Sequence, residues 1–322
     1  MESFTRRPRP VTGGRGVRAL RRSPRAKSVL LIGVGLIGIG LVGSSAGCGT
    51  DPAPSPPPAA APARASSVPS SETVDELVRV GDGRLHVRCV GAGATTVLLI
   101  AGFNDGGDNW GEIEPALARQ ARVCSYARFG TGDSDPPTRT QTFATSAQAL
   151  HALLAEIGQQ GPHVVVGHSY GGGEAVTFAS RYRREVVGLV LLDATPPGWI
   201  AAGCAVPEDG SEAAAGFHDR CPDPADPADN PERMDEVAAF AGLSAIESLG
   251  ALPLAVVTAA DHPFPGLESA ATARLNEVWD DGQEGWLSLS SDAHLRSVDD
   301  TGHYIQLDRP EVALSEIRGL LP

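Results

Sequence analysis

The apolar residues of this chain fall into two alternating patterns from about residue 74 onward. Short runs without a polar break, such as 96–100 (TVLLI) and 186–192 (VVGLVLL), are typical of strands buried on both faces. Longer segments between them, such as 146–157 (SAQALHALLAEI), carry apolar residues three and four positions apart, the spacing of a helix that buries one face. This alternation predicts the α/β class, with a mostly parallel sheet covered on both sides.

The same patterns give the order of elements along the chain. Two strands joined by a tight turn, GDG at 81–83, open the series. Later strands are expected at 96–100, 122–126, from 164, at 186–192, 252–259 and 295–298, and helices at 113–120, 146–157, 173–182, 270–280 and 310–321.

Residues 196–250 break this rhythm. The stretch begins with Pro196-Pro197, continues through CPDPADPADNP at 221–231, and regains a helical pattern only at 234–249. We expect it to be a cap insertion over the carboxyl ends of the strands, where open α/β sheets place their sites.

The first 48 residues differ from the rest in charge and hydropathy. Residues 1–27 hold about nine of the 26 Lys and Arg residues, and 29–43 form an uncharged apolar run. At about 15 residues this run is shorter than the roughly 20 that a membrane-spanning helix needs. Residues 1–48 are therefore predicted to be an export signal, with both the general secretory and the twin-arginine route left open.

The end of this signal, SSAGCG, resembles the lipobox of bacterial lipoproteins. In that motif the cysteine becomes the lipidated first residue of the mature protein, which makes Cys48 the lipidation candidate. Ser45 stands where a lipobox usually has an aliphatic residue, so cleavage after an A-x-A-like site and an uncleaved anchor remain alternatives. All three place the rest of the chain outside the cytoplasm, either anchored to the cell membrane or secreted.

Residues 49–72 are rich in proline, alanine and serine without periodicity, which predicts a semi-extended linker before a domain at 73–322. After Cys48 about 17 basic residues face about 38 acids, roughly −21 against −13 for the whole chain. This charge argues against nucleic acid or anionic lipid as a partner.

Composition fits a globular domain, with 42% hydrophobic and 20% charged residues in 322. Four cysteines remain after Cys48: Cys89, Cys124, Cys204 and Cys221. An even number in an exported chain predicts two disulfides, and four cysteines allow three connectivities.

The most informative chemical motif is G-x-S-x-G at 167–171, with Ser169 at its centre. It lies between an apolar strand and a segment with helical spacing. A serine hydroxyl is a weak nucleophile at neutral pH, so an enzyme must expose it, place a base beside it and stabilise the anion that forms. A sharp strand-to-helix turn exposes the oxygen, and its glycines leave room for backbone and substrate.

Five segments in this order resemble the α/β-hydrolase superfamily, and the resemblance covers essentially all of residues 74–322. The segments are LLIAGFNDGGDNW (98–110), YARFGTGDSD (126–135), VVVGHSYGG (164–172), LAVVTAADHPFPG (254–266) and DTGHYIQLDRPE (300–311). The resemblance implies an eight-stranded, mostly parallel sheet with helices on both faces and a short cap insertion.

The resemblance also implies catalytic roles. Ser169 is the expected nucleophile and His303 the general base, held in orientation by an acid. Asp261 is the preferred acid because it follows the apolar strand 254–258 and gives the chain order Ser, Asp, His. Asp193, at the end of an earlier strand, is the alternative acid.

The oxyanion donors implied by the resemblance are the backbone amides of Tyr170, directly after the nucleophile, and Phe103, in the loop after the third strand. Ala101 replaces the family's usual histidine in that loop, and Ala127 replaces the aspartate of its Y-D-R motif. His168 is expected to support the turn rather than to act as the base.

The strand order of this family makes the second and fourth strands neighbours. This order implies a pairing of Cys89 with Cys124, on those strands, and therefore of Cys204 with Cys221 within the insertion.

The sequence thus predicts a serine hydrolase that cleaves carboxylic esters through an acyl-enzyme, with a small ester or amide as substrate and without cofactor or metal. A peptidase or amidase of the same fold and a non-catalytic, surface-anchored binding protein are the alternatives. A serine at the turn argues against the epoxide-hydrolysing branch, which needs a carboxylate there. Candidate pocket residues in or near the insertion are Trp199, Phe217, Phe240 and Phe264.

Overall fold

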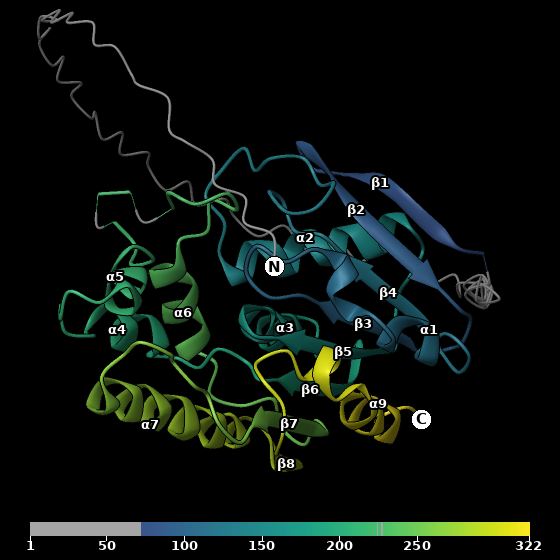
Figure 1. Ribbon diagram of the computed structural model, residues 1–322. Coiled ribbons are helices and arrows are strands. Elements are labelled where there is room, and N and C mark those ends of the chain that lie inside the picture. The colour runs from purple at the N-terminus through teal and green to yellow at the C-terminus, as the bar shows by residue number, and fades with distance from the viewer. Residues whose placement is uncertain (1–71, 224, 227) are drawn as a thin grey trace, which may run out of the picture. The chain divides into compact units, whose positions relative to one another are not determined.

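The structure is a computed structural model that describes residues 72–223, 225–226 and 228–322 (Figure 1). All of these fall within one compact unit, Ala65–Pro322. The predicted export signal, Cys48 and the linker as far as residue 71 lie outside the described residues. Anchoring and localisation therefore stay predictions.

In the described part of the chain, eight strands form one sheet in the order β1-β2-β4-β3-β5-β6-β7-β8. β2 pairs antiparallel with both β1 and β4, and all the other neighbours are parallel, as predicted. The strands are β1 Val74–Val80, β2 Gly83–Val90, β3 Thr96–Ile100, β4 Arg122–Tyr126, β5 His163–His168, β6 Val186–Leu192, β7 Leu254–Ala259 and β8 Ala293–Val298.

Burial along the strands follows their place in the sheet. Every residue of β3, β4, β5 and β7 is buried, because helices cover both faces at the centre. The edge strands β1 and β8 are mostly exposed or half-buried and carry charged side chains, which keeps other chains from pairing with them.

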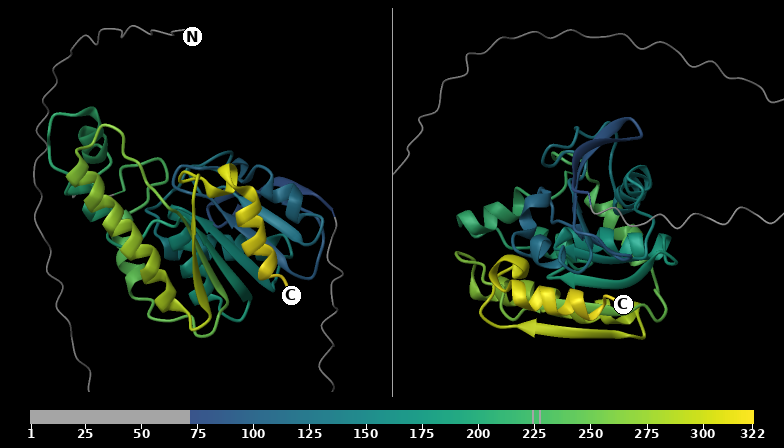
Figure 2. Two further views of the ribbon diagram at one scale, coloured as in Figure 1. Left: turned by 60° about the horizontal axis from the view of Figure 1, so that its bottom comes forward. Right: turned by 90° about the vertical axis from the view of Figure 1, so that its right-hand side faces the viewer.

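Two helical layers enclose the sheet. The core on one face includes Leu150 of α2 and Phe178 of α3, and the core on the other includes Leu117 of α1 and Ile317 of α9. Figure 2 shows the strands between α7 and α9. The helices outside the insertion are α1 Ile113–Leu117, α2 Phe143–Glu156, α3 Tyr170–Arg181, α7 Ser269–Trp286, α8 Ile305–Asp308 and α9 Pro310–Gly319, with short 3₁₀ turns η1 Gly107–Trp110 and η2 Leu287–Leu289.

Two helices begin or end away from their predicted limits. α2 starts before residue 146 because Thr142 caps it, exchanging side-chain and backbone hydrogen bonds with Thr145. α7 continues past residue 280 because Trp279 and Trp286 bury its inner face. Gly282 lies inside this helix, where the absence of a side chain lets α7 pack against Pro196. An added Cβ would lie 2.1 Å from the Pro196 ring.

The insertion 196–250 forms three short helices, α4 Trp199–Cys204, α5 Glu212–His218 and α6 Glu236–Ser244. A small apolar cluster ties it to α7 through Val206, Ala214 and Leu275. Figure 1 shows these helices on the α7 side of the sheet. The part of the insertion around α4 and α5 therefore shares a small core with α7, whereas α6 joins a core of the sheet through Phe240 and Leu243.

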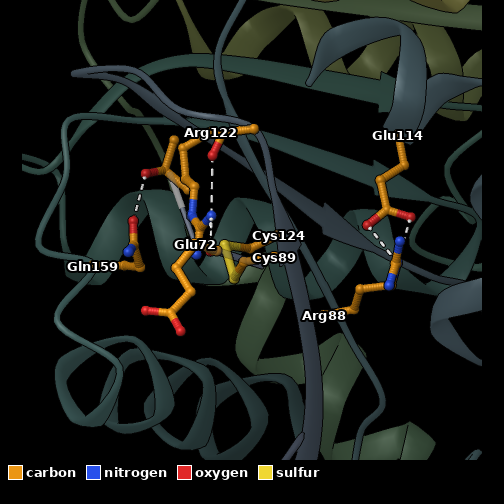
Figure 3. The surroundings of a disulfide bond; sticks show 9 residues. Glu72, Arg88, Cys89, Glu114, Arg122, Cys124 and Gln159 are labelled. Carbon is orange, nitrogen blue, oxygen red and sulfur yellow. Dashed lines mark hydrogen bonds and ion pairs between the residues drawn. A yellow bond between two sulfur atoms is a disulfide. The ribbon is translucent and has the colours of Figure 1, made fainter. Parts of the chain in front are cut away.

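Both predicted disulfides are present. Cys89 and Cys124 lie directly opposite each other on β2 and β4, and Cys204 pairs with Cys221 inside the insertion. Figure 3 shows the first bridge beside Arg122, whose buried guanidinium donates to the Gly91 carbonyl oxygen at 3.0 Å. One disulfide thus fastens the sheet and the other fastens the insertion.

Candidate active site

The G-x-S-x-G motif forms the expected strand-to-helix turn. β5 ends at His168, α3 begins at Tyr170, and Ser169 between them has φ 51° and ψ −125°, a strained conformation for a residue with a side chain. A Cβ on Gly171 would come within 2.3 Å of the Ile100 carbonyl oxygen. Only glycine therefore permits this close approach of α3 to β3. The side chain of Ser169 projects from the turn into the cavity.

Three side chains from distant parts of the chain meet at this turn. The His303 Nε2 atom lies 2.9 Å from the Ser169 hydroxyl oxygen, and its Nδ1 atom lies 2.7 Å from a carboxylate oxygen of Asp193. Asp193 directly follows β6, and His303 lies in the loop between β8 and α8. The Thr195 hydroxyl is also near Ser169, with 3.3 Å between the oxygens. The arrangement is a continuous serine, histidine and carboxylate relay.

The Asp193 carboxylate is fully buried and surrounded by donors. Besides His303, it accepts hydrogen bonds from the Thr258 hydroxyl at 2.8 Å and the Trp279 indole at 3.1 Å, and the His262 Nε2 atom lies at 2.8 Å. Burial alone would raise the pKa of Asp193, but its contacts with His262 and His303 hold that pKa well below the usual range. The carboxylate therefore stays charged next to the imidazole.

The preference for Asp261 as the acid partner of His303 was wrong. No hydrogen bond or ion pair in the described part of the chain joins Asp261 to His303, and the Asp261 side chain is exposed at the cavity. β7 ends at Ala259, so Asp261 has already left the strand, and it is the next residue, His262, that turns inward to Asp193. The alternative, Asp193, occupies the position.

Sequence reasoning missed most of the groups that hold the acid. His262 directly follows Asp261, but no motif gave it a role, and Trp279 falls within the helix predicted at 270–280. Trp279 reaches Asp193 across 86 positions of sequence. A signal existed, because α7 places Trp279 and Trp286 seven residues apart on its buried face. That periodicity predicts burial but not a polar contact.

Both predicted oxyanion residues lie beside Ser169 and line the same cavity, with their rings 5.3 Å apart. The Phe103 amide donates no hydrogen bond within the described residues. The Tyr170 amide is at the first position of α3, where no carbonyl of the helix can accept from it. Both donors are thus free to bind a ligand oxygen.

A buried ion pair supports the loop that carries Phe103. Arg128 donates to the carbonyl oxygens of Ala101 and Gly102, and its Nε donates to Glu232 at 2.7 Å. Glu232 also accepts from the Asn104 amide at 2.6 Å. This carboxylate comes from the insertion, between α5 and α6, so the insertion and the oxyanion loop are joined through charged hydrogen bonds.

His168 is a supporting side chain, as predicted, but the part that it contacts is the loop of His303. It is fully buried, and its Nε2 atom lies 2.9 Å from the His303 carbonyl oxygen. Burial lowers the pKa of His168 to about 3, so the ring is neutral and donates to that carbonyl. A neutral His168 places no positive charge beside His303.

Ser169 opens onto a cavity of about 1110 Å³. The insertion supplies one wall, including Trp199 and Phe217, and Phe264 from the loop after β7 joins them. These three predicted pocket residues are in place. Phe240 instead packs in the core, with its ring 5.2 Å from that of Phe143. The strand ends thus provide the floor of the cavity, and the insertion provides much of its wall.

The described residues hold no group of three or more His, Cys, Asp or Glu side chains placed to bind a metal ion. Nor does any helix among them combine the length and the apolar character that crossing a membrane requires.

Comparison with known proteins agrees with this architecture. A family model for the alpha/beta hydrolase fold matches residues 95–207. The structure is similar to the crystal structure of Cfl2 wild-type from Burkholderia cenocepacia, with a TM-score of 0.55, 20% sequence identity, and coverage of 77% of this chain and 95% of that one. This chain has the α/β-hydrolase fold. It is also similar to a thermophilic esterase from Thermogutta terrifontis, with a TM-score of 0.53, 19% identity, and coverage of 77% and 97%.

Among curated relatives, a soluble epoxide hydrolase from Corynebacterium sp. (strain C12) is 33% identical over 138 residues, which are 43% of this chain and 47% of that protein. A putative non-heme chloroperoxidase from Synechocystis sp. (strain PCC 6803) is 36% identical over 117 residues, 36% and 42% of the two chains. The chain spans less than half the length of these relatives, so their activities do not transfer to it directly.

Proposed function

We propose that this chain is a serine hydrolase that cleaves carboxylic esters through an acyl-enzyme. The observation that carries the proposal is the relay from Ser169 through His303 to Asp193, with 2.9 and 2.7 Å between the paired atoms. Both distances are within hydrogen-bond reach, which is the geometry that a nucleophile, its base and an orienting acid require.

In the first half-reaction His303 removes the proton of the Ser169 hydroxyl as its oxygen attacks the ester carbonyl carbon. The carbonyl oxygen becomes an anion that accepts hydrogen bonds from the amides of Phe103 and Tyr170. Asp193 stabilises the imidazolium at its Nδ1 side. The carbon–oxygen bond to the alcohol then breaks, and His303 gives its proton to the departing alcohol.

In the second half-reaction water replaces the alcohol. His303 takes a proton from the water as its oxygen attacks the acyl carbon, and the same two amides stabilise the second anion. The acid product leaves when His303 returns the proton to the Ser169 oxygen. Serine and histidine end as they began, so the net reaction is hydrolysis of one ester bond.

Two features of the site support the serine mechanism over the activity named for the epoxide hydrolase relative. Attack on an epoxide through an ester intermediate requires a carboxylate nucleophile, and this chain has Ser169 at the turn. The buried carboxylate at the site, Asp193, lies behind His303 rather than in front of it. Asp193 is therefore placed to orient a base and not to attack substrate.

The test is labelling with a fluorophosphonate, which reacts with activated serines. The wild-type protein is expected to be labelled and to hydrolyse a panel of aryl esters, and Ser169→Ala is expected to lose both properties. Ser297→Ala, an exposed serine on β8, is the matched control and should behave as the wild type. Labelling that persists in Ser169→Ala would remove Ser169 from the proposed role.

The two alternatives make different predictions in the same experiment. A peptidase or amidase would be labelled at Ser169 and would cleave aryl amides faster than the matching esters. A binding protein without catalysis would be neither labelled nor active on any member of the panel. Faster cleavage of esters than of amides, together with labelling, supports the ester hydrolase.

We further propose that the domain acts outside the cytoplasm, tethered through a lipid on Cys48. Two disulfides support this location, since such bonds persist in oxidising compartments. The full chain, expressed in a bacterium with a lipoprotein pathway and fed an alkyne fatty acid, should carry the label in its membrane fraction. Cys48→Ser should lose it, whereas unchanged labelling would contradict lipidation at this residue.

A further inference from the structure

The cavity above Ser169 is strongly acidic. Eight of its lining residues are aspartate or glutamate, whereas Arg220 is the one lysine or arginine among its described lining residues. None of the eight forms an ion pair with another described residue. Unpaired charges of one sign in a concave site concentrate ions of the opposite sign. The lining therefore favours a positively charged ligand over a neutral or anionic one.

Arg220 offsets at most one of these eight charges and forms an ion pair with none of them. Its guanidinium lies over the ring of Phe217, 5.4 Å from the ring centroid, and its Nε donates to the Gly216 carbonyl oxygen at 2.9 Å. Its contact with Phe217 also shows that the aromatic wall of this cavity can accept a cation.

A second, independent observation comes from Tyr170. Its side chain is 4% exposed, it lines the cavity, and its hydroxyl has no hydrogen-bond partner among the described residues. A buried hydroxyl without a partner costs about 1–3 kcal/mol, so a partner that arrives with a ligand is favoured. A ligand bound in the cavity can therefore supply the hydrogen bond that the Tyr170 hydroxyl lacks.

Among the carboxylates, Glu236, the first residue of α6, has the largest electrostatic effect on the Tyr170 hydroxyl. Burial raises the pKa of Tyr170 well above its usual value, and Glu236 is the charged group that adds most to the rise. Glu236 lines the same cavity and forms no side-chain hydrogen bond or ion pair with another described residue, the Tyr170 hydroxyl included. Geometry places the two groups near each other: Phe240, one turn after Glu236 on α6, has its ring 5.6 Å from that of Tyr170, and Glu236 and Tyr170 line the same cavity.

The same corner of the cavity is aromatic. The rings of Phe103 and Tyr170 lie 5.3 Å apart beside Ser169. A carboxylate next to two aromatic rings is the combination that binds ammonium groups, by charge attraction and by contact of the cation with the ring faces.

We infer that the cavity selects esters that carry an ammonium group, with the cation held between the Glu236 carboxylate and the rings of Tyr170 and Phe103. This inference rests on the proposed function and adds the substrate class to it. Glu236 is a specificity residue in this view, since it contacts the substrate away from the bond that breaks. A neutral polar substituent would also satisfy the Tyr170 hydroxyl, so the experiment has to separate charge from shape.

The experiment compares two pairs of esters that differ in charge. For the alcohol part the pair is choline butyrate and 3,3-dimethylbutyl butyrate, whose cation has no N–H, and for the acyl part it is the 4-nitrophenyl esters of 6-ammoniohexanoate and heptanoate, whose cation can also donate to the Tyr170 hydroxyl oxygen. In at least one pair the cationic ester is expected to have a kcat/KM about tenfold higher. The preference should shrink at high salt, because part of the attraction is screened.

Three variants, assayed at about pH 8.5 so that Glu236 is mainly ionised, show whether Glu236 causes the preference. Glu236→Gln should lower the ratio of cationic to neutral kcat/KM about fivefold or more, and Glu236→Asp, which keeps the charge, should retain most of it. Glu247→Gln removes one charge from an exposed position outside the cavity and should leave the ratio unchanged. Equal ratios in the wild type and Glu236→Gln would overturn the inference, as would a wild-type preference for the neutral ester in both pairs.

A binding measurement separates this inference from the proposed function. Choline and 3,3-dimethylbutan-1-ol are titrated into the full Ser169→Ala chain by calorimetry, where no turnover is needed. Tighter binding of choline, weakened by the added Glu236→Gln substitution, supports the cation site even if the protein cleaves no ester. Tighter binding of the neutral alcohol overturns the cation site even if ester hydrolysis and labelling are found.

Discussion

The floor and the wall of the cavity each contain a buried or partly buried carboxylate, and the two are held in opposite ways. Asp193, at the end of β6, is fully buried and receives hydrogen bonds on all sides, so its pKa lies well below the usual range. Glu236, in the insertion, has no polar partner in the part of the chain that the structure describes, and burial raises its pKa to about 7. The sheet supplies a charge that is fully stabilised within the protein, whereas the insertion supplies a carboxyl group that is partly protonated near pH 7 and that a bound cation would hold ionised.

Under the proposed function, this difference separates two tasks, which are orienting the catalytic base and recognising the substrate. A group that must orient a base through every turnover benefits from a rigid set of donors, and the strand ends provide it. A group that recognises a substrate must be left incomplete until the substrate binds, and the short helices of the insertion allow that. The predictions below test this division, beginning with the largest effect.

The largest expected difference is between the effects on kcat of substituting the two candidate acids, Asp193 and Asp261. Asp193→Asn should lower kcat about 10⁴-fold, since the amide cannot stabilise the imidazolium and favours the wrong tautomer of His303. Asp261→Asn, at the exposed position, should change kcat less than about twofold. Steady-state kinetics on one aryl ester measure both. The order of the two effects would be reversed if Asp261 were the acid.

The link between the two regions should show an intermediate effect. Glu232→Gln removes the charge that holds Arg128 and the Asn104 amide, so the oxyanion loop loses its support from the insertion. We expect kcat to fall about tenfold with little change in KM, because a misplaced donor weakens the transition state more than the bound substrate. Glu277→Gln, an exposed glutamate on α7, is the matched control.

A stability measurement complements that prediction. Breaking a buried ion pair by removing one partner costs about 3–5 kcal/mol. Denaturant unfolding of Glu232→Gln should therefore show a clear loss against wild type. Equal stability and equal kcat would mean that Arg128 holds the loop without help from the insertion.

The smallest expected effects are opposite responses to pH in the two regions. On β5, burial lowers the pKa of His163 to about 4, below the roughly 6.5 of an exposed histidine. Its contribution to stability is therefore complete above about pH 6.5 and is lost as the pH falls towards 4. As the pH falls over that range, the free energy of unfolding of His163→Leu should rise relative to that of the wild type, by on the order of 1.4 kcal/mol per pH unit.

For Glu236 the sign is reversed. Its pKa in the folded protein, about 7, lies above the ordinary value of 4.5, so the folded state favours the protonated form. That contribution is complete below about pH 4.5 and is lost as the pH rises through 7. The free energy of unfolding of Glu236→Gln should thus rise relative to that of the wild type as the pH rises from 4.5 to 7. Chemical denaturation of both variants at several pH values tests the pair, and slopes of the same sign would contradict the comparison.

The sequence predicted the sheet region better than the insertion, for a physical reason. Buried parallel strands are uniform apolar runs, and a turn that packs backbone against backbone demands glycine, so Ser169 and its surroundings could be located from local patterns. His303 followed from its motif. The insertion has no periodicity between 219 and 235, so nothing in the sequence indicated that Glu232 reaches Arg128 across 104 positions.

The choice of acid failed for a different reason. Asp193 and Asp261 both follow buried strands, and their spacing along the chain does not say which side chain turns inward. That depends on the backbone at each position. Asp193 has φ 44°, an uncommon value that points it into the site, and Trp279 and Thr258 then close around it. Contacts of this kind arise from packing between elements, which a single sequence does not record.

The bridge between Cys204 and Cys221 has a consequence for the binding site under reducing conditions. Both cysteines line the cavity, so the bond closes a 17-residue loop that forms part of its wall. Ser169, Asp193 and His303 lie outside that loop, so reduction of the bond would loosen the wall of the cavity and leave the relay held by the strand ends. Under the proposed function, we expect a reducing compartment to change which substrates fit more than it changes the activation of Ser169.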